Sequence, residues 1–219
     1  MRPTGACIID HVLGGFPPGL PLVIAGPSGS GRTVLGLQLA NSALLRGEVV
    51  QIVSSEPAKS LMHQADALGF ALDAALAEER LVLLELDAST PSLVRSQGVE
   101  PLVEALRAEA PEVDLVIIDP FTAITAEIVD EPRLRELSRA FVRALGAETL
   151  VLMVETERLR QQRGLDRVLS ELCGAYLVLD REAGVVVARD HVAVGHGRAA
   201  DRVRVGVVLQ LDAVLAVAA

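Results

Sequence analysis

Aromatic residues are scarce in this sequence, and tryptophan is absent. Aromatics make up 2% of the 219 residues, whereas hydrophobic residues make up 51%. A chain this apolar is globular rather than disordered. Because aromatics are few, the core must consist of Leu, Val, Ile and Ala, a composition that suits parallel strands covered by helices. The scarcity also leaves few side chains on which nucleic-acid bases could stack.

Positive charge, cysteine and long apolar runs are also limited. The formal net charge is −9, and Lys59 is the only lysine among 20 Lys and Arg residues. Such a charge repels nucleic-acid backbones unless a local basic patch intervenes. Cys7 and Cys173 fit no metal-binding or redox spacing, which indicates free thiols in a reducing compartment. With neither a run of roughly 18 apolar residues nor a signal-peptide pattern, we expect a cytoplasmic protein with no membrane partner.

Apolar segments of strand length alternate with segments of helical periodicity. The expected strands are PLVIAG (21–26), EVVQIVSSE (48–56), RLVLLELD (80–87), DLVIIDP (114–120) and TLVLMVE (149–155). From residue 175 strands follow in quick succession: AYLVLD, GVVVARDHV, DRVRVGVVLQL and AVLAVAA. Strands that alternate with helices require crossover connections and a parallel sheet, and the closing strands add an antiparallel edge. We expect one α/β domain over residues 1–219, a mostly parallel twisted sheet flanked by helices with a C-terminal antiparallel extension.

The stretch GPSGSGRT between the first expected strand and helix has the form of a phosphate-binding loop. It comprises Gly26, Pro27, Ser28, Gly29, Ser30, Gly31, Arg32 and Thr33. The spacing matches the P-loop motif except that arginine replaces the lysine. The glycines let several backbone N–H groups point into one cavity, where the helix dipole also attracts phosphate. Thr33 supplies a hydroxyl for Mg²⁺.

Arg32 allows two interpretations. Arginine remains cationic, so it can compensate phosphate charge, but its planar fork is longer and bulkier than the ammonium group of lysine. The replacement therefore favours retained binding with impaired hydrolysis. In a chain with a single lysine, it also fits a general exchange of lysine for arginine. The sequence leaves both interpretations open.

Two carboxylates are expected at the same edge of the sheet as the loop. Asp119 ends the strand LVIID, where P-loop folds hold a carboxylate that orients Mg²⁺. Glu56 follows the second strand and can either polarise a water molecule or stabilise a helix N-terminus. Glu155, which ends the fifth strand, and Glu157 occupy a place where this kind of fold often keeps a polar sensor of the γ-phosphate, but we assign neither to catalysis.

Four stretches follow one another in an order typical of one protein family. They are TGACIIDHVLGGFPPGLPLVIAGPSGSGRT (4–33), SSEPAKSLMHQADALGF (54–70), DLVIIDPFTAI (114–124) and VLSELCGAYLVLD (168–180). In this respect the chain resembles the KaiC-like branch of the RecA superfamily. The resemblance implies a RecA-like P-loop NTPase core with ATP and Mg²⁺ as ligands. It also implies a homo-oligomer with nucleotide at the subunit interfaces.

The sequence departs from this family at groups that set the rate of hydrolysis. The family usually has two adjacent glutamates after the second strand, and the alignment puts Ser55 at the first place and Glu56 at the second. The family also places basic residues on a late strand, where they reach a neighbour's γ-phosphate, and Arg189 matches the first of these. The resemblance therefore implies Glu56 and Arg189 as catalytic residues, although a solvated strand charge is the alternative for Arg189.

Three functions remain open on the sequence alone. The first is an Mg·ATP-binding protein with weak or lost hydrolysis that acts as a nucleotide-dependent regulator or assembly factor, together with a possible protein partner. The second is an active, slow ATPase that uses Glu56. The third is a recombination-type ATPase whose basic segment Arg158–Arg167 forms a DNA-binding loop. The net charge and the lack of aromatics in that segment make DNA the least favoured partner.

Overall fold

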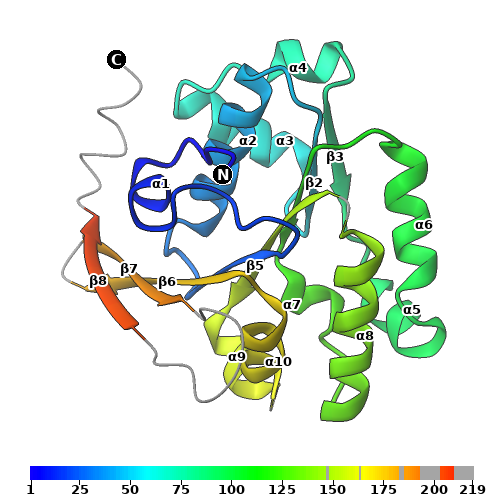
Figure 1. Cartoon of the computed structure of the whole chain (residues 1–219). Coiled ribbons are helices and arrows are strands. Elements are labelled where there is room, and N and C mark those ends of the chain that lie inside the picture. Colours follow the sequence, from blue (N-terminus) through cyan, green and yellow to red (C-terminus); the bar gives the residue numbers. More distant parts are fainter. Residues whose placement is uncertain (147, 163, 183–184, 193–202, 210–219) are drawn as a thin grey trace.

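An eight-stranded sheet lies at the centre of the computed structural model, which describes residues 1–146, 148–162, 164–182, 185–192 and 203–209 (Figure 1). The strands are β1 (Leu22–Gly26), β2 (Val50–Ser54), β3 (Leu81–Glu85), β4 (Leu115–Asp119), β5 (Thr149–Glu155), β6 (Ala175–Glu182), β7 (Val185–Val192) and β8 (Val203–Leu209). Their order is β3-β2-β4-β5-β1-β6-β7-β8. The first six are parallel, and β7 and β8 add antiparallel pairs at one edge. The predicted α/β fold is confirmed.

Helices cover both faces of the sheet (Figure 1). One face packs against α1 (Cys7–Leu13), α2 (Arg32–Leu45), α3 (Ala58–Ala67) and α4 (Asp73–Ala77). The other packs against α5 (Thr90–Gln97), α6 (Glu100–Glu109), α7 (Phe121–Ile124), α8 (Glu131–Ala144), α9 (Thr156–Gln161) and α10 (Leu165–Leu172). Successive residues of a strand point to opposite faces, so Leu22 and Ile24 join the first core while Val23 and Ala25 join the second. This explains why the central strands are apolar throughout.

The strand register brings several polar residues to one edge of the sheet. Gly26 pairs with Glu155, and Ser54 pairs with Asp119 on one side and Glu85 on the other. All five residues end parallel strands, so they share the carboxyl edge. Ligand groups of open α/β sheets gather at this edge. The fold therefore places the phosphate loop, which follows Gly26, beside the ends of β2, β4 and β5.

The structure corrects several details of the predicted elements. Four short helices, α1, α4, α7 and α9, were not expected from the sequence. The segment Arg158–Arg167 is not one loop, because its first residues belong to α9 and its last residues to α10. The expected strand AVLAVAA lies outside the described residues. Within the described part of the chain, no helix combines the length and hydropathy that a membrane span requires.

Candidate functional site

The stretch from Gly26 to Thr33 forms a compact turn between β1 and α2. Gly29 and Gly31 have φ angles of 74° and 85°, a left-handed conformation that glycine adopts without steric cost. A Cβ atom on Gly26 would lie 2.4 Å from the Ser30 Oγ and 3.1 Å from the Leu179 carbonyl oxygen. The loop therefore folds tightly only because glycine occupies these places.

The loop presents donors that lack an acceptor. Helix α2 begins at Arg32 with no side-chain cap and no acidic residue in its first turn. The N–H groups of a first turn have no acceptor within the helix, and the dipole makes this end positive. The Ser30 Oγ and the Arg32 Nη1 are both buried without a hydrogen-bond partner in the described part of the chain. Buried donors of this kind are rare, and together these favour an anion at the loop.

Arg32 is held in the site by a carboxylate. Its side chain is 9% exposed, and its Nη2 lies 3.6 Å from Glu155 Oε1 at the end of β5. Its Nη1 has no hydrogen-bond partner among the described residues. A buried guanidinium needs a counter-charge, because burial of an unpaired cation is costly. The sequence placed Glu155 where such folds often keep a polar sensor, but it did not predict the contact with Arg32. The pairing of β5 with β1 is what brings Glu155 to the phosphate loop.

Thr33 and Asp119, which the sequence predicted to act together, form the second pair of the site. The Thr33 hydroxyl donates to Asp119 Oδ2 at 2.8 Å. Burial raises the pKa of Asp119 above its usual value, while the hydrogen bond from Thr33 and the charge of Arg32 act in the opposite direction. The carboxylates of Glu56 and Glu155 are near enough to raise this pKa further. The structure thus places Arg32, Thr33, Glu56 and Glu155 around Asp119.

Glu56 is engaged by the helix that follows it. Its Oε2 accepts hydrogen bonds from Gln64 Nε2 at 2.7 Å and from the Ser60 hydroxyl at 3.3 Å, both on α3. Its backbone N–H donates to the Ser54 hydroxyl at 3.0 Å. Ser55, at the place of the family's first glutamate, is exposed and lines a hollow of about 270 Å³, together with Leu86 and Asp87, which follow β3. The carboxylate is therefore tethered to α3, and the position next to it carries only a hydroxyl.

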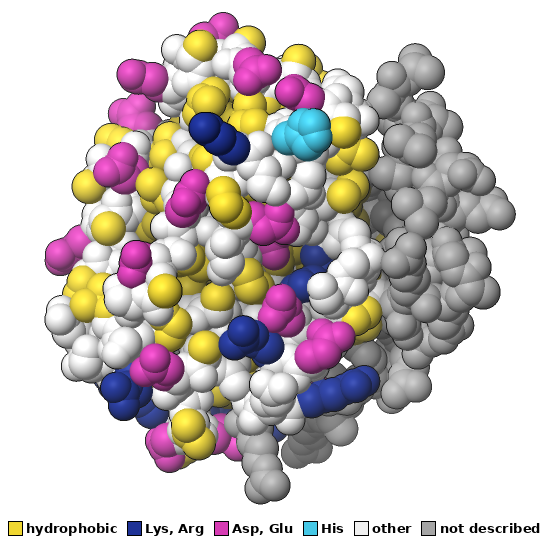
Figure 2. All heavy atoms as spheres, turned by 180° about the vertical axis from the view of Figure 1, so that it is seen from behind, with side chains coloured by type: hydrophobic (Ala, Val, Ile, Leu, Met, Phe, Trp, Pro, Cys, Tyr) yellow, Lys and Arg dark blue, Asp and Glu magenta, His cyan; other side chains and the backbone are white. Residues whose placement is uncertain are grey.

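Two further predictions concern residues away from the loop. Arg189 lies on β7, where it pairs with Val178, and its side chain lies outside the described residues. In the basic segment, Arg158 pairs with Glu155 at 3.1 Å, and Arg167 pairs with Glu131. Figure 2 shows acidic and basic side chains interspersed on one face of the molecule. Arg158 and Arg167 are therefore paired with carboxylates of the chain itself, which weakens the case for a DNA-binding loop.

The sequence matches proteins of the expected superfamily over part of their length. Protein RecA of Treponema denticola is 32% identical over 133 residues, which cover 59% of this chain and 28% of that protein. Circadian clock protein KaiC2 of Synechocystis sp. is 36% identical over 84 residues, which cover 37% of this chain and 15% of that protein. The chain thus spans less than a third of the length of these relatives.

A solved structure and a family model extend the similarity to most of the chain. The flagellar accessory protein FlaH from Methanocaldococcus jannaschii superposes with a TM-score of 0.67 at 18% identity, covering 87% of this chain and 86% of that one. At this identity the match shows a shared fold. The family model for the KaiC ATPase matches residues 2–187. The chain therefore belongs to the KaiC ATPase family, whose domain is a RecA-like P-loop ATPase fold.

Proposed function

We propose that this protein binds Mg·ATP at the loop Gly26–Thr33, hydrolyses it weakly or not at all, and acts as a nucleotide-dependent regulator or assembly factor. The observation that carries the proposal is a pair of buried donors at the uncapped start of α2, Ser30 Oγ and Arg32 Nη1, which have no partner among the residues that the structure describes. Polyphosphate oxygens accept from such donors, and their charge is favoured at a helix N-terminus.

The neighbouring oxygen groups fit a magnesium ion. No group of three or more His, Cys, Asp and Glu side chains arranged to hold a metal occurs among the described residues. Mg²⁺ does not need one, since it keeps several waters and is usually held by one or two side chains together with phosphate oxygens. Thr33 Oγ1 and Asp119, joined at 2.8 Å, are the residues that would hold it. When bound, the ion would neutralise charge on the phosphates.

Three features of the site support weak hydrolysis. Activation of the attacking water requires a group that orients it or accepts its proton. Ser55 has no carboxylate that could activate the water. The Glu56 carboxylate accepts hydrogen bonds from Gln64 and Ser60, which hold it against α3. Arg32 keeps the charge of the usual lysine with a different shape. These features act on the rate rather than on binding.

An active, slow ATPase is the second candidate. The observation that favours it is the proximity of the Glu56 carboxylate to Asp119, which is close enough to raise the pKa of Asp119. Both hydrogen bonds to the Glu56 carboxylate go to Oε2, so Oε1 remains a candidate acceptor for a water molecule. For this function Glu56 must activate the water while its Oε2 stays hydrogen-bonded to α3.

A regulatory role needs binding and not turnover. A ligand that binds only the folded state stabilises it by about 2.7 kcal/mol when its concentration is 100 times Kd. If the nucleotide sits between two subunits, the same free energy favours assembly. In the proposed assembly Arg189 reaches the nucleotide of a neighbouring subunit.

The proposal is tested by measuring three quantities on one preparation: the melting temperature, the sedimentation coefficient and the release of phosphate, each with and without Mg·ATP. We expect a higher melting temperature and a larger assembly with nucleotide, with phosphate release near background. Rapid turnover with an unchanged assembly state would support the ATPase instead. An unchanged melting temperature at millimolar Mg·ATP would contradict binding, and with it both candidates.

A further inference from the structure

Glu155 lies between two arginines that come from different helices. Its Oε1 is 3.6 Å from the Nη2 of Arg32, at the start of α2, and its Oε2 accepts from the Nε of Arg158 on α9 at 3.1 Å. The two arginines differ in surroundings, since the Arg32 side chain is 9% exposed and that of Arg158 is 51% exposed. One carboxylate thus connects the phosphate loop to the helix that follows β5.

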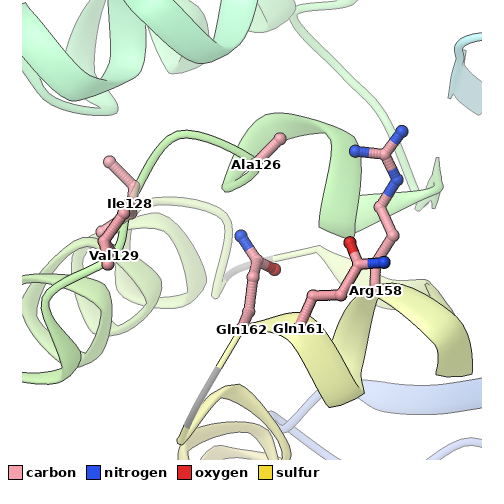
Figure 3. Close-up of a pocket in the computed structure, with 6 residues that line it drawn as sticks. All are labelled: Ala126, Ile128, Val129, Arg158, Gln161 and Gln162. Atoms are coloured by element: carbon pink, nitrogen blue, oxygen red, sulfur yellow. The ribbon is translucent and has the colours of Figure 1, made fainter.

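Arg158 lines a hollow beside α9, and its side chain is half-exposed. The hollow has a volume of about 200 Å³ and is also lined by Gln161, Gln162, Ile128 and Val129. Figure 3 shows Arg158 and Gln161 rising side by side from α9, with the apolar residues across the hollow. A half-exposed arginine in such a place can follow a carboxylate that changes position.

The position of Glu155 creates an electrostatic conflict with phosphate. A carboxylate beside a polyphosphate site repels the ligand, and a phosphate that engages Arg32 competes with Glu155 for the same guanidinium. Without phosphate, Glu155 stabilises the buried Arg32. With phosphate bound, Glu155 needs another cation, and Arg158 already contacts its second oxygen.

We propose that Glu155 is the counter-ion of Arg32 in the nucleotide-free protein and that Arg158 takes over this carboxylate when phosphate binds. Both act as positioning residues, because they affect the ligand only through Arg32. This inference rests on the proposed function, since it assumes that Arg32 binds the phosphates of Mg·ATP. It goes beyond that function in one respect: the affinity of the loop for Mg·ATP depends partly on α9, through the contact of Arg158 with Glu155.

The test is a double-mutant cycle on Mg·ATP affinity, measured by calorimetry. Arg158→Gln should weaken binding roughly two- to fivefold, the range expected for a partly exposed ion pair. Glu155→Gln should tighten binding, because it removes the competing carboxylate. In the Glu155→Gln background, Arg158→Gln should have no effect. Arg160→Gln is the matched control, since Arg160 is exposed on the same helix and forms no ion pair among the described residues.

The melting temperature of the nucleotide-free protein gives a second readout. Glu155→Gln should lower it, because the buried Arg32 loses its partner, while Arg158→Gln should leave it nearly unchanged. Equal affinities of Arg158→Gln and Arg160→Gln would overturn the inference, as would an effect of Arg158→Gln that persists without Glu155. These outcomes differ from failure of the proposed function, in which the native protein itself would not bind Mg·ATP.

Discussion

The hydroxyl of Thr33 donates a hydrogen bond of 2.8 Å to the carboxylate of Asp119, across 86 positions of sequence. The bond joins the first turn of α2 to the end of β4, and it leaves the lone pairs of the hydroxyl for a cation. The two residues are far apart in the sequence, so no local structure brings them together. Their contact follows from the parallel sheet, in which β4 and β1 both run toward the carboxyl edge.

Thr33 should govern the magnesium dependence of ATP binding. We expect Thr33→Val, which removes the hydroxyl at nearly constant volume, to weaken binding of Mg·ATP about tenfold or more, with little effect on binding of ATP in EDTA. Thr33→Ser keeps a hydroxyl and should retain the magnesium dependence. Calorimetry with and without Mg²⁺ measures both. Equal losses of Mg·ATP affinity in Thr33→Val and Thr33→Ser would contradict this expectation, because the hydroxyl that Thr33→Ser keeps would then not preserve the magnesium dependence.

Asp119 should make the stability of the nucleotide-free protein depend on pH. Burial raises its pKa in the folded state, so its favourable contribution is present below the pKa of the unfolded carboxyl and is lost as the pH rises through the raised pKa. Asp119→Asn should therefore raise the melting temperature at pH 7 and change it little at pH 4. Magnesium requires the ionised carboxylate, so Mg·ATP affinity of the native protein should fall over the same range as the pH is lowered.

Melting curves of the two proteins between pH 4 and 7 check this expectation. Asp114→Asn, at the opposite end of β4, is the matched control, since its side-chain oxygen can still accept the hydrogen bond from the Val49 N–H. If Asp119→Asn instead lowers the melting temperature at pH 7, the hydrogen bond from Thr33 and the charge of Arg32 outweigh the cost of burying the carboxylate.

Arg32 should be required for nucleotide binding even though it replaces a lysine. Removing a buried cation that contacts phosphate costs considerably more than removing an exposed one. We expect Arg32→Gln to weaken Mg·ATP binding by at least tenfold. Arg46→Gln, at the other end of α2, removes the same charge from an exposed pair with Glu48 and should change affinity by less than about twofold. Similar losses in both variants would indicate a long-range effect of charge rather than a contact with phosphate.

Ser55 offers a way to gain hydrolysis. The side chain is exposed beside the hollow of about 270 Å³, so a longer residue fits without displacing the core. We expect Ser55→Glu to raise the rate of phosphate release at saturating Mg·ATP by at least tenfold, since a positioned base contributes on the order of a hundredfold or more. Ser55→Gln has the same length without the charge and should not raise it. Equal rates of phosphate release in Ser55→Glu and Ser55→Gln would show that the lack of a carboxylate at position 55 does not limit hydrolysis.

Much of the fold could be predicted from the sequence because its signals are local. A strand such as LVIID, buried on both faces, is apolar at every position, and Gly26, Gly29 and Gly31 mark a turn that few other residues permit. Short helices were missed for a related reason. The helix FTAI has four residues, which is too few for a helical period to emerge.

The contacts of the site that escaped prediction depend on how strands and helices are arranged around it. Glu155 ends β5, and it meets Arg32 only because β5 lies next to β1 in the sheet. The hydrogen bond between Glu56 and Gln64 likewise depends on how α3 leaves the end of β2. A single sequence specifies residue types and periods, whereas these contacts arise from the order of strands and the direction of a helix.

Calorimetric titration of Mg·ATP into the native protein, with a Thr33→Ala and Asp119→Ala double variant as the control, tests the central claim most directly. We predict saturable binding to the native protein and its loss in the double variant. Such a result would identify GPSGSGRT as a working phosphate loop despite Arg32. No heat of binding with a folded native protein would contradict the account, because the buried donors of the loop would then not serve a nucleotide.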